Sequence, residues 1–454
     1  MRDGSVSIVW FRRDLRLADN PALTAACSRA ERVVLLYVHA PGEEGDWPPG
    51  AASRWWLHES LARLTAALRG RGAELHLRHG PSLEALLSVA HATGAGGVHW
   101  NRLYEPALAA RDAEVASRLR AAGLTVESCN AAMLVEPWDV RTGEDRPYRV
   151  FTPYWRACAP KLNEQPRPLP PPHIRCAPLT DAGPSLGELG LRPVIRWDAG
   201  LHEAWTPGEV GALARLDAFC ESEVGGYAES RDRPDQHGTS RLSPHLHFGE
   251  IGPRQCLAAA RNALAGRAGR QPGFDAFVRQ LGWRDFAHHV LHHHPHTIAT
   301  PLDARFAGFS WQPDARLLEA WQRGRTGYPL VDAGMRELWA TGWMHNRVRM
   351  IAASLLTKNL RQHWLDGARW FWDTLVDADL ANNTLGWQWV AGCGADAAPY
   401  FRIFNPGLQA ARHDPDGAYR RRWLPGRESS PVAPVVDFRA SRAAALAAYS
   451  HLGR

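Results

Sequence analysis

A run of small and hydroxylated residues at positions 238–251, GTSRLSPHLHFGEI, has the composition of a phosphate-binding loop. It places Thr239, Ser240, Arg241 and Ser243 directly before a segment with helical character. Backbone amides at a helix start, hydroxyl groups and a guanidinium can together hold a pyrophosphate. The alternative is an ordinary capped loop, which is the more frequent explanation when the residue types are considered alone.

A second polar cluster lies in DTLVDADLANN, residues 373–383, and contains Asp377, Asp379, Asn382 and Asn383. Two carboxylates this close in sequence are found at metal sites and, more often, on solvated helix faces. Residue types alone do not decide between these two alternatives.

Histidines form a third cluster, HHVLHHHPH, with His288, His289, His292, His293, His294 and His296. Spacings of four residues within it could place metal ligands on one face of a helix. Pro295 is expected to end that helix, and a polar helix end explains the cluster without a metal. We therefore predict no metal site.

The net charge and the tryptophan content indicate which kinds of ligand the protein could bind. Lys and Arg total 53 against 47 Asp and Glu, so the formal net charge is +6, an excess compatible with a polyanionic partner. The chain also has 20 tryptophans, side chains that stack on bases or flavins and readily give up an electron. Charge by itself is weak evidence for nucleic-acid binding.

Seven scattered cysteines without CxxC spacing argue against a disulfide framework and against a structural zinc site. No stretch approaches the roughly 18 apolar residues of a transmembrane helix. The first residues, MRDGSVSIVWFRRDLR, do not form the apolar core of a signal peptide. A cytoplasmic protein with reduced thiols is expected.

The elements that must position these clusters change in character along the chain. Short β-branched runs at 5–10, 32–39, 73–78, 97–101 and 125–129 alternate with helical patterns, which predicts a parallel, doubly wound sheet over residues 1–130. No GxGxxG follows the first run, so a nicotinamide dinucleotide is not expected there. Residues 131–205, which include LNEQPRPLPPPHIRCAPL, are predicted to be a surface connector. Residues 206–454 should be largely α-helical.

VWFRRDLRLADNPAL, residues 9–23, could simply be a solvated strand-to-helix loop with Asp19 or Asn20 as the helix N-cap. As a string, however, it resembles the N-terminal signature of the DNA photolyase/cryptochrome family. The resemblance continues in order through NRLYEP, YRVFTPYWRAC, GTSRLSPHLHFGEI, GWMHNRVRM and DTLVDADLANNTLGWQW, over nearly the whole chain. Bacterial cyclobutane pyrimidine dimer photolyases of class I or class III type are the most similar members.

The resemblance implies an N-terminal Rossmann-like parallel α/β domain and a C-terminal all-α domain that binds FAD, with FADH⁻ as the active form. It assigns the FAD diphosphate to the loop at 238–243 and the isoalloxazine to the second polar cluster. There Asp377 would pair with Arg349, Asp379 would accept from the ring edge, and Asn383 would face N5. The implied cofactor-binding residues are Tyr227, Thr239, Ser240, Arg241, Leu242, Ser243, Arg349, Asp377, Asp379 and Asn383.

The resemblance also implies an electron-hopping route through Trp387, Trp364 and Trp311. Photolyases flip the damaged dinucleotide of UV-damaged DNA into an aromatic pocket over the flavin. Trp283 and Trp389 match the stacking walls of that pocket, and Asn346 and Met350 match its floor and rim. The matching contacts to DNA phosphate or the pocket edge are Arg231, Arg347 and Arg402.

One position departs from the pattern of the family. In FVRQLGWRDF, Gln280 stands where dimer photolyases of this type carry a glutamate that hydrogen-bonds the dimer. A glutamine keeps an acceptor and gains donors, but it supplies neither a carboxylic proton nor a charge-assisted hydrogen bond. Efficient dimer repair is therefore in question at this position.

The predicted function is light-dependent splitting of cyclobutane pyrimidine dimers by electron transfer from the flavin, in a monomer. The alternative is a blue-light photoreceptor of the cryptochrome type, or a homologue that has lost repair. His345 followed by Asn346 resembles dimer-type rather than (6-4) enzymes, and a flavin oxidoreductase is disfavoured by the missing nicotinamide motif. A folate or deazaflavin antenna in the N-terminal domain stays open, and GAASRWWLHESL would line its pocket.

Overall fold

The computed structural model describes residues 5–181, 183–264, 268–397, 401–426 and 432–452. The chain divides into two compact units. Unit 1 comprises residues 1–136, 160–221 and 240–266, and unit 2 comprises residues 137–159, 222–239 and 267–454. The segment at 131–205 is therefore built into both units, whereas the composition of the sequence had suggested a separate connector.

Unit 1 is built on a five-stranded parallel sheet with the order β3-β2-β1-β4-β5. The strands are β1 (Val6–Phe11), β2 (Arg32–His39), β3 (Leu75–His79), β4 (Gly97–Asn101) and β5 (Thr125–Cys129). The β-branched runs of the sequence predicted all five, with β1 and β3 displaced by one or two residues. This strand order is that of a doubly wound fold, as expected.

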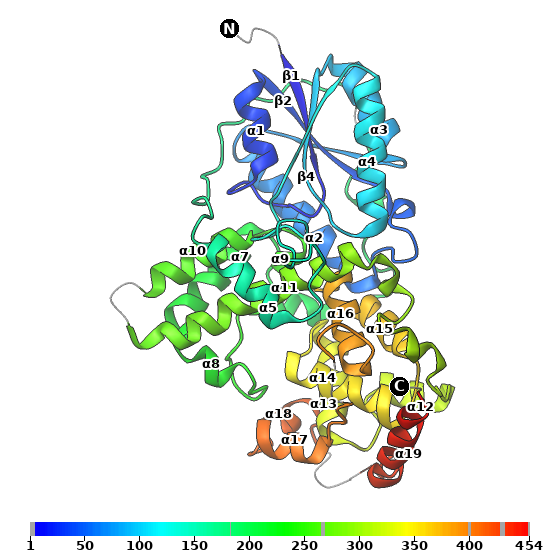
Figure 1. Ribbon diagram of the computed structural model, residues 1–454. Helices are drawn as coiled ribbons and strands as arrows, with labels where there is room; N and C mark the ends of the chain where they lie inside the picture. The colour runs from blue at the N-terminus through cyan, green and yellow to red at the C-terminus, as the bar shows by residue number, and fades with distance from the viewer. Residues whose placement is uncertain (1–4, 182, 265–267, 398–400, 427–431, 453–454) are drawn as a thin grey trace. The chain divides into compact units, whose positions relative to one another are not determined.

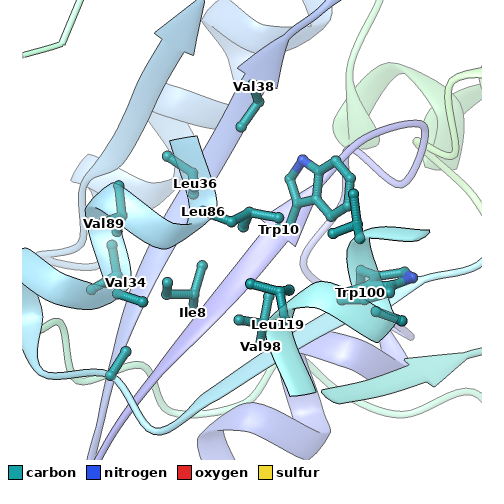
Figure 2. Close-up of a cluster of buried hydrophobic side chains, with 14 of the residues drawn as sticks. Ile8, Trp10, Val34, Leu36, Val38, Leu86, Val89, Val98, Trp100 and Leu119 are labelled. Atoms are coloured by element: carbon teal, nitrogen blue, oxygen red, sulfur yellow. The ribbon is translucent and has the colours of Figure 1, made fainter. Parts of the chain in front are cut away.

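Helices cover both faces of the sheet, with α1 on one face and α3 and α4 on the other (Figure 1). The helices of unit 1 are α1 (Pro21–Arg29), α2 (Ala51–Arg69), α3 (Ser82–Thr93), α4 (Pro106–Ala121), α6 (Ala199–Ala204), α7 (Glu209–Ala218), α9 (Ser243–His247) and α10 (Pro253–Leu264). Figure 2 shows Ile8, Trp10, Val34 and Leu36 of the strands packing with side chains such as Leu86. The central strands are buried on both faces, which explains their nearly unbroken apolar sequence.

The loop after β1 holds the three arginines of VWFRRDLR. Asn20 caps α1, because its side chain accepts a hydrogen bond from the amide of Leu23. Arg12 donates two hydrogen bonds to Asp112, with N–O distances of 3.0 and 2.9 Å. Arg16 is 1% exposed and donates to the carbonyl oxygens of Asp19, Ala131 and Gly249. This motif is therefore part of the internal structure of unit 1.

Unit 2 is helical, as the sequence predicted, and no strand occurs in the described part of it. Its helices are α5 (Phe151–Cys158), α8 (Tyr227–Ser230), α11 (Gln271–His293), α12 (Ala315–Gln322), α13 (Pro329–Thr341), α14 (Asn346–Ser354), α15 (Trp364–Thr374), α16 (Leu380–Ala391), α17 (Pro406–His413), α18 (Ala418–Trp423) and α19 (Phe438–Ser450). Side chains of His345, His363 and Asp379 cap α14, α15 and α16. Among the described residues, no helix is long and apolar enough to cross a bilayer.

Candidate functional site

The predicted phosphate-binding loop spans the point where the chain passes from unit 2 to unit 1. In unit 1, the Ser240 carbonyl accepts a hydrogen bond of 2.8 Å from Arg215 Nε. Arg241 has a φ of 50°, and its guanidinium lies 4.3 Å from the centre of the Trp205 ring. Leu242 is buried and Ser243 begins α9, so the expected turn followed by a helix is present. Thr239 and Tyr227 belong to unit 2. Tyr227 is largely buried, and this burial raises its pKa.

An ion pair joins α14 to the segment before α16. Arg349 Nη2 lies 3.0 and 2.8 Å from the two carboxylate oxygens of Asp377. Arg349 Nε also donates to the carbonyl of Met344 at 2.7 Å. The expected pairing of Asp377 with Arg349 is confirmed, and it fixes the direction of the guanidinium.

Two further polar residues of this cluster have their orientation set by internal hydrogen bonds. Asp379 Oδ1 accepts from the backbone amide and from Nδ2 of Asn382, at 2.8 and 2.7 Å. Asn383 Nδ2 donates to the carbonyl of Ala368 at 3.1 Å. Because the amide nitrogen of Asn383 is engaged, its carbonyl Oδ1 is the atom left to accept a hydrogen bond.

These donors and acceptors suit a flavin ring better than a metal ion. The edge of an isoalloxazine offers N–H donors, which Asp379 and Asn383 Oδ1 can accept, and carbonyl acceptors, which Arg349 can serve. In the described part of the chain, no group of three or more His, Cys, Asp or Glu side chains is arranged to hold a metal. The geometry thus fits the group that the sequence resemblance implies.

An aromatic wall on α11 is supported from α5. The ring of Trp283 stacks on Phe151, with centroids 3.8 Å apart and an angle of 8° between the planes. Phe151 in turn stacks on Trp155 at 6.0 Å. One face of Trp283 is therefore covered within unit 2, and a base can stack only on the opposite face.

Gln280 lies one helical turn before Trp283 and contacts an arginine. Arg231 Nη2 donates to Gln280 Oε1 at 3.2 Å. Arginine has donors only, so the carbonyl oxygen of the amide must face it. Gln280 Nε2, with two N–H groups, has no hydrogen-bond partner among the described residues.

Two of the predicted DNA-binding arginines share one carboxylate. Arg347 Nη2 lies 2.6 Å from Asp232 Oδ2, and Arg231 Nε lies 3.8 Å from Asp232 Oδ1. Burial raises the pKa of Asp232, but the hydrogen bond from Arg347 and the charges of both arginines outweigh it and lower that pKa. One carboxylate between two guanidinium groups leaves this part of unit 2 with an excess of positive charge.

The remaining predicted pocket residues lie near these arginines or beside the second aromatic wall. Asn346 and Arg347 both contact the sulfur of Met350, at 3.9 Å. Trp389 Nε1 donates to the carbonyl of Asp396, and the guanidinium of Arg402 lies 5.4 Å from the centre of the Trp389 ring. Asn346 and Arg402 are exposed, as contacts to a large ligand require.

The three tryptophans of the predicted electron route differ in burial. Trp387 and Trp364 are 3% and 1% exposed, whereas Trp311 is partly exposed. The ring of His363 lies 5.0 Å from that of Trp311 and 5.8 Å from that of Trp364. Trp387 packs against Gly367 of α15, where a Cβ atom would lie 2.1 Å from its ring. The gradient from buried to exposed fits a route from the protein interior to the surface.

Sequence reasoning did not single out Phe151, Asp232 or His363. Phe151 lies in the aromatic motif YRVFTPYWRAC, but nothing in the sequence indicates that it stacks on Trp283, more than 130 positions away. Asp232 directly follows Arg231, and a local charge pair was the only available signal. His363 precedes Trp364 and caps α15 by accepting from the amide of Leu365.

Comparisons with known proteins agree with the fold. The profile for the FAD-binding domain of DNA photolyase matches residues 277–448, and the DNA photolyase profile matches residues 7–173. A deoxyribodipyrimidine photo-lyase from Agrobacterium fabrum is 45% identical over 93% of this chain and 87% of its own length. Cryptochrome-1 from Arabidopsis thaliana is 40% identical over 93% of this chain and 63% of its own length.

Solved structures extend this result to the arrangement of the backbone. A bacterial class III photolyase from Agrobacterium tumefaciens superposes with a TM-score of 0.93 at 41% identity, covering 99% of this chain and 98% of that one. A cryptochrome from Synechocystis superposes with a TM-score of 0.88 at 26% identity, over 98% of this chain and all of that one. The protein therefore belongs to the DNA photolyase family and carries that family's FAD-binding domain.

Proposed function

We propose that this protein is a light-dependent DNA repair enzyme that splits cyclobutane pyrimidine dimers in UV-damaged DNA. Relatives named deoxyribodipyrimidine photo-lyase, at 37–45% identity over most of the chain, support this proposal. When bound, reduced FAD supplies the light absorption and the electron that the reaction needs. The residues of the protein bind and orient the cofactor and the lesion.

The proposed cofactor contacts follow from the two polar clusters described above. Arg349 is oriented by Asp377, so that its guanidinium can donate to a ring carbonyl. Asp379 and Asn383 Oδ1, oriented by their internal hydrogen bonds, are proposed to accept from N–H groups of the ring. The hydroxyl groups and the guanidinium of residues 239–243 are proposed to bind the diphosphate, together with Tyr227.

The orientation of Gln280 is the observation that carries the repair proposal. Because Arg231 holds its carbonyl oxygen, the amide nitrogen presents two N–H donors. The pyrimidines of a dimer carry carbonyl oxygens, which are acceptors. A glutamine held in this way can replace the hydrogen bond expected from a glutamate, although it cannot supply the proton or the charge.

The other pocket residues are proposed to hold the flipped dinucleotide. The free face of Trp283 would stack on one base, and Trp389 would form the second wall. Each base stacked on an aromatic ring contributes about 1–3 kcal/mol to binding. Arg231, Arg347 and Arg402 would contact phosphates, which position the strand without reading its sequence.

A cryptochrome-type photoreceptor is the second candidate function. Two observations favour it: Gln280 replaces the expected glutamate, and Cryptochrome-1 of Arabidopsis thaliana is 40% identical to the chain. The residues proposed for the lesion pocket, among them the stacked Trp283 and the arginines, favour repair.

Repair of a thymine-dimer oligonucleotide under blue light by the reduced, FAD-loaded protein tests the proposal. Wild type, Gln280→Glu and Gln280→Ala are compared, with dark samples as the control. We expect wild type to repair, and Gln280→Ala to be slowed roughly 2- to 13-fold, the equivalent of one hydrogen bond of about 0.5–1.5 kcal/mol. If only Gln280→Glu repairs the dimer, the proposal that the wild-type protein is a repair enzyme is rejected. The protein would then be a photoreceptor or a repair-deficient homologue.

We further propose that the protein acts as a monomer in the cytoplasm. All seven cysteines are free thiols, which is usual in a reducing compartment. The antenna chromophore of unit 1, a folate or a deazaflavin, stays a prediction. Chromatography of the chromophores released from the purified protein identifies it.

A further inference from the structure

His288 and His289 are adjacent, buried residues of α11 whose ring nitrogens face different kinds of partner. For His289, Nδ1 lies 2.8 Å from the carbonyl of Pro137, and Nε2 lies 3.0 Å from the backbone amide nitrogen of Tyr148. A carbonyl accepts and an amide donates, so this ring carries a single proton, on Nδ1. His289 is therefore neutral, and burial lowers its pKa to about 4.

His288 meets an acceptor at each end. Its Nδ1 lies 3.0 Å from the carbonyl oxygen of Arg284, and its Nε2 lies 3.5 Å from Asp379 Oδ2. A neutral imidazole can donate to only one of these oxygens, whereas an imidazolium donates to both. Burial lowers the pKa of His288, but the charge of Asp379 and the hydrogen bond to it outweigh that effect and raise the pKa.

Asp379 needs such a partner. Asp379 is 8% exposed, and a buried carboxylate is unfavourable unless it is paired. The Asn382 side chain and amide occupy Oδ1, so the contact with His288 falls on Oδ2. The two contacts together set both the charge and the rotation of the carboxylate.

We propose that His288 is a positioning residue: a protonated imidazolium on α11 that keeps Asp379 ionised and turned toward the flavin ring. This inference rests on the proposed function, because it takes Asp379 to be a flavin contact. The charged groups facing His288 are Asp379, from α16, and Arg284, one turn earlier on α11. The pair is neutral overall, so it presents no net negative charge to a flavin that gains an electron.

Loss of the cation has a predictable consequence. With a neutral side chain at position 288, Asp379 either stays ionised beside the flavin without its counter-charge or takes up a proton and accepts from the ring only as a neutral group. An uncompensated carboxylate disfavours an added electron, so the midpoint potential of bound FAD becomes more negative. A protonated Asp379 loses a charge-assisted hydrogen bond, which weakens FAD binding roughly tenfold.

The test combines two measurements on the FAD-loaded protein. The first is ¹⁵N NMR of histidine-labelled wild type between pH 6 and 9, in which His288→Gln identifies the His288 signals. The second is redox titration of bound FAD in wild type, His288→Gln, Asp379→Asn and the double variant. His289→Gln is the matched control, since a glutamine can donate to Pro137 and accept from Tyr148 in its place.

We expect two protonated ring nitrogens for His288 at pH values where an unperturbed histidine, with a pKa of about 6.5, is neutral, and one for its neighbour His289. We also expect a negative shift of the midpoint potential in His288→Gln that disappears in the Asp379→Asn background and is absent in His289→Gln. A neutral His288 in wild type would overturn the proposal. So would an imidazolium whose removal changes neither the midpoint potential of bound FAD nor the Kd of FAD. If wild type binds no FAD at all, the proposed function is rejected instead. Failure of the proposed function is in this way distinguished from failure of the inference on His288.

Discussion

Arg12 and Arg16 in unit 1 and Arg231 and Arg347 in unit 2 carry the same side chain in contrasting surroundings. The first two are 6% and 1% exposed and donate to partners inside their unit. The side chains of the other two are 21% and 20% exposed and share one carboxylate, that of Asp232. The arginines of unit 1 have structural roles, whereas those of unit 2 keep part of their charge available to a ligand.

The comparison shows that a motif can identify a family without containing its active residues. VWFRRDLR is the N-terminal signature on which the resemblance starts, and its arginines stabilise the loop after β1. The residues proposed to touch a ligand lie in later parts of the chain. Four experiments test this contrast.

Substitution of Arg16 by alanine should have the largest effect. It leaves the buried carbonyls of Asp19, Ala131 and Gly249 without their donor, and each such loss costs about 1–3 kcal/mol. We expect the free energy of unfolding, measured by urea denaturation, to fall by at least about 3 kcal/mol, the sum of the three losses at the lower end of that range. Arg347→Ala is the control and should cost less than about 1 kcal/mol. Equal losses in the two variants would contradict the contrast.

Trp283→Ala should weaken binding of dimer-containing DNA without unfolding the protein. Loss of one stacked base removes about 1–3 kcal/mol, which is roughly a 5- to 150-fold rise in Kd. Fluorescence anisotropy with a dimer-containing oligonucleotide measures this change. Trp339, which is 64% exposed and stacks on Trp370, serves as the control for a tryptophan outside the pocket. An equal effect of Trp339→Ala would remove the stacking assignment.

His289 extends the contrast to unit 2, because it is a buried residue with internal partners only a few positions from the pocket. Its pKa is about 4 in the folded protein, against about 6.5 in an unfolded chain. Between these values the unfolded chain binds more protons, so stability falls as pH falls, by up to about 1.4 kcal/mol per pH unit.

Urea denaturation between pH 7 and 4 measures this dependence. His289→Gln should make it less steep, because the variant lacks the titrating group. The exposed His296→Gln serves as the control and should leave it unchanged. A profile of His289→Gln that matches wild type would show that His289 is not held neutral.

Arg347→Gln should have the smallest effect, a few-fold loss of DNA affinity. Removing one phosphate contact lowers the slope of log K against log salt concentration by about 0.9 for duplex DNA, or about 0.7 for a single strand. Titrations between 50 and 200 mM salt measure that slope. Arg305→Gln is the matched control, since Arg305 is an exposed arginine paired with Asp303. An unchanged slope in Arg347→Gln would remove it from the phosphate contacts.

Much of the fold followed from local patterns in the sequence. Strands β1 and β2 were predictable because central parallel strands are buried on both faces and are almost continuously apolar. The partly buried edge strands β3 and β5 followed from their alternation with helical patterns. The helical character of unit 2 followed from the 3.6-residue period, and the start of α9 at Ser243 from its small-residue turn. The assignment of segments 137–159, 160–221 and 240–266 to the two units did not follow, because segments distant in sequence pack together in each unit.

The types of the candidate site residues were also fixed by the sequence, through motifs that resemble a known family. Their partners were not. These partners depend on how helices far apart in sequence pack. Arg231 faces Gln280 Oε1, and Phe151 covers one face of Trp283. Asp379 contacts both Asn382 and His288.

The sequence by itself determined the family, the two kinds of architecture and the chemical groups that the site can offer. Only the tertiary structure decided which of these groups are satisfied internally and which can serve a ligand. His288 and His289 are adjacent and identical in type, yet one faces two acceptors and the other an acceptor and a donor. The protonation state of a buried group depends on its neighbours in space, and these neighbours are known only from the tertiary structure.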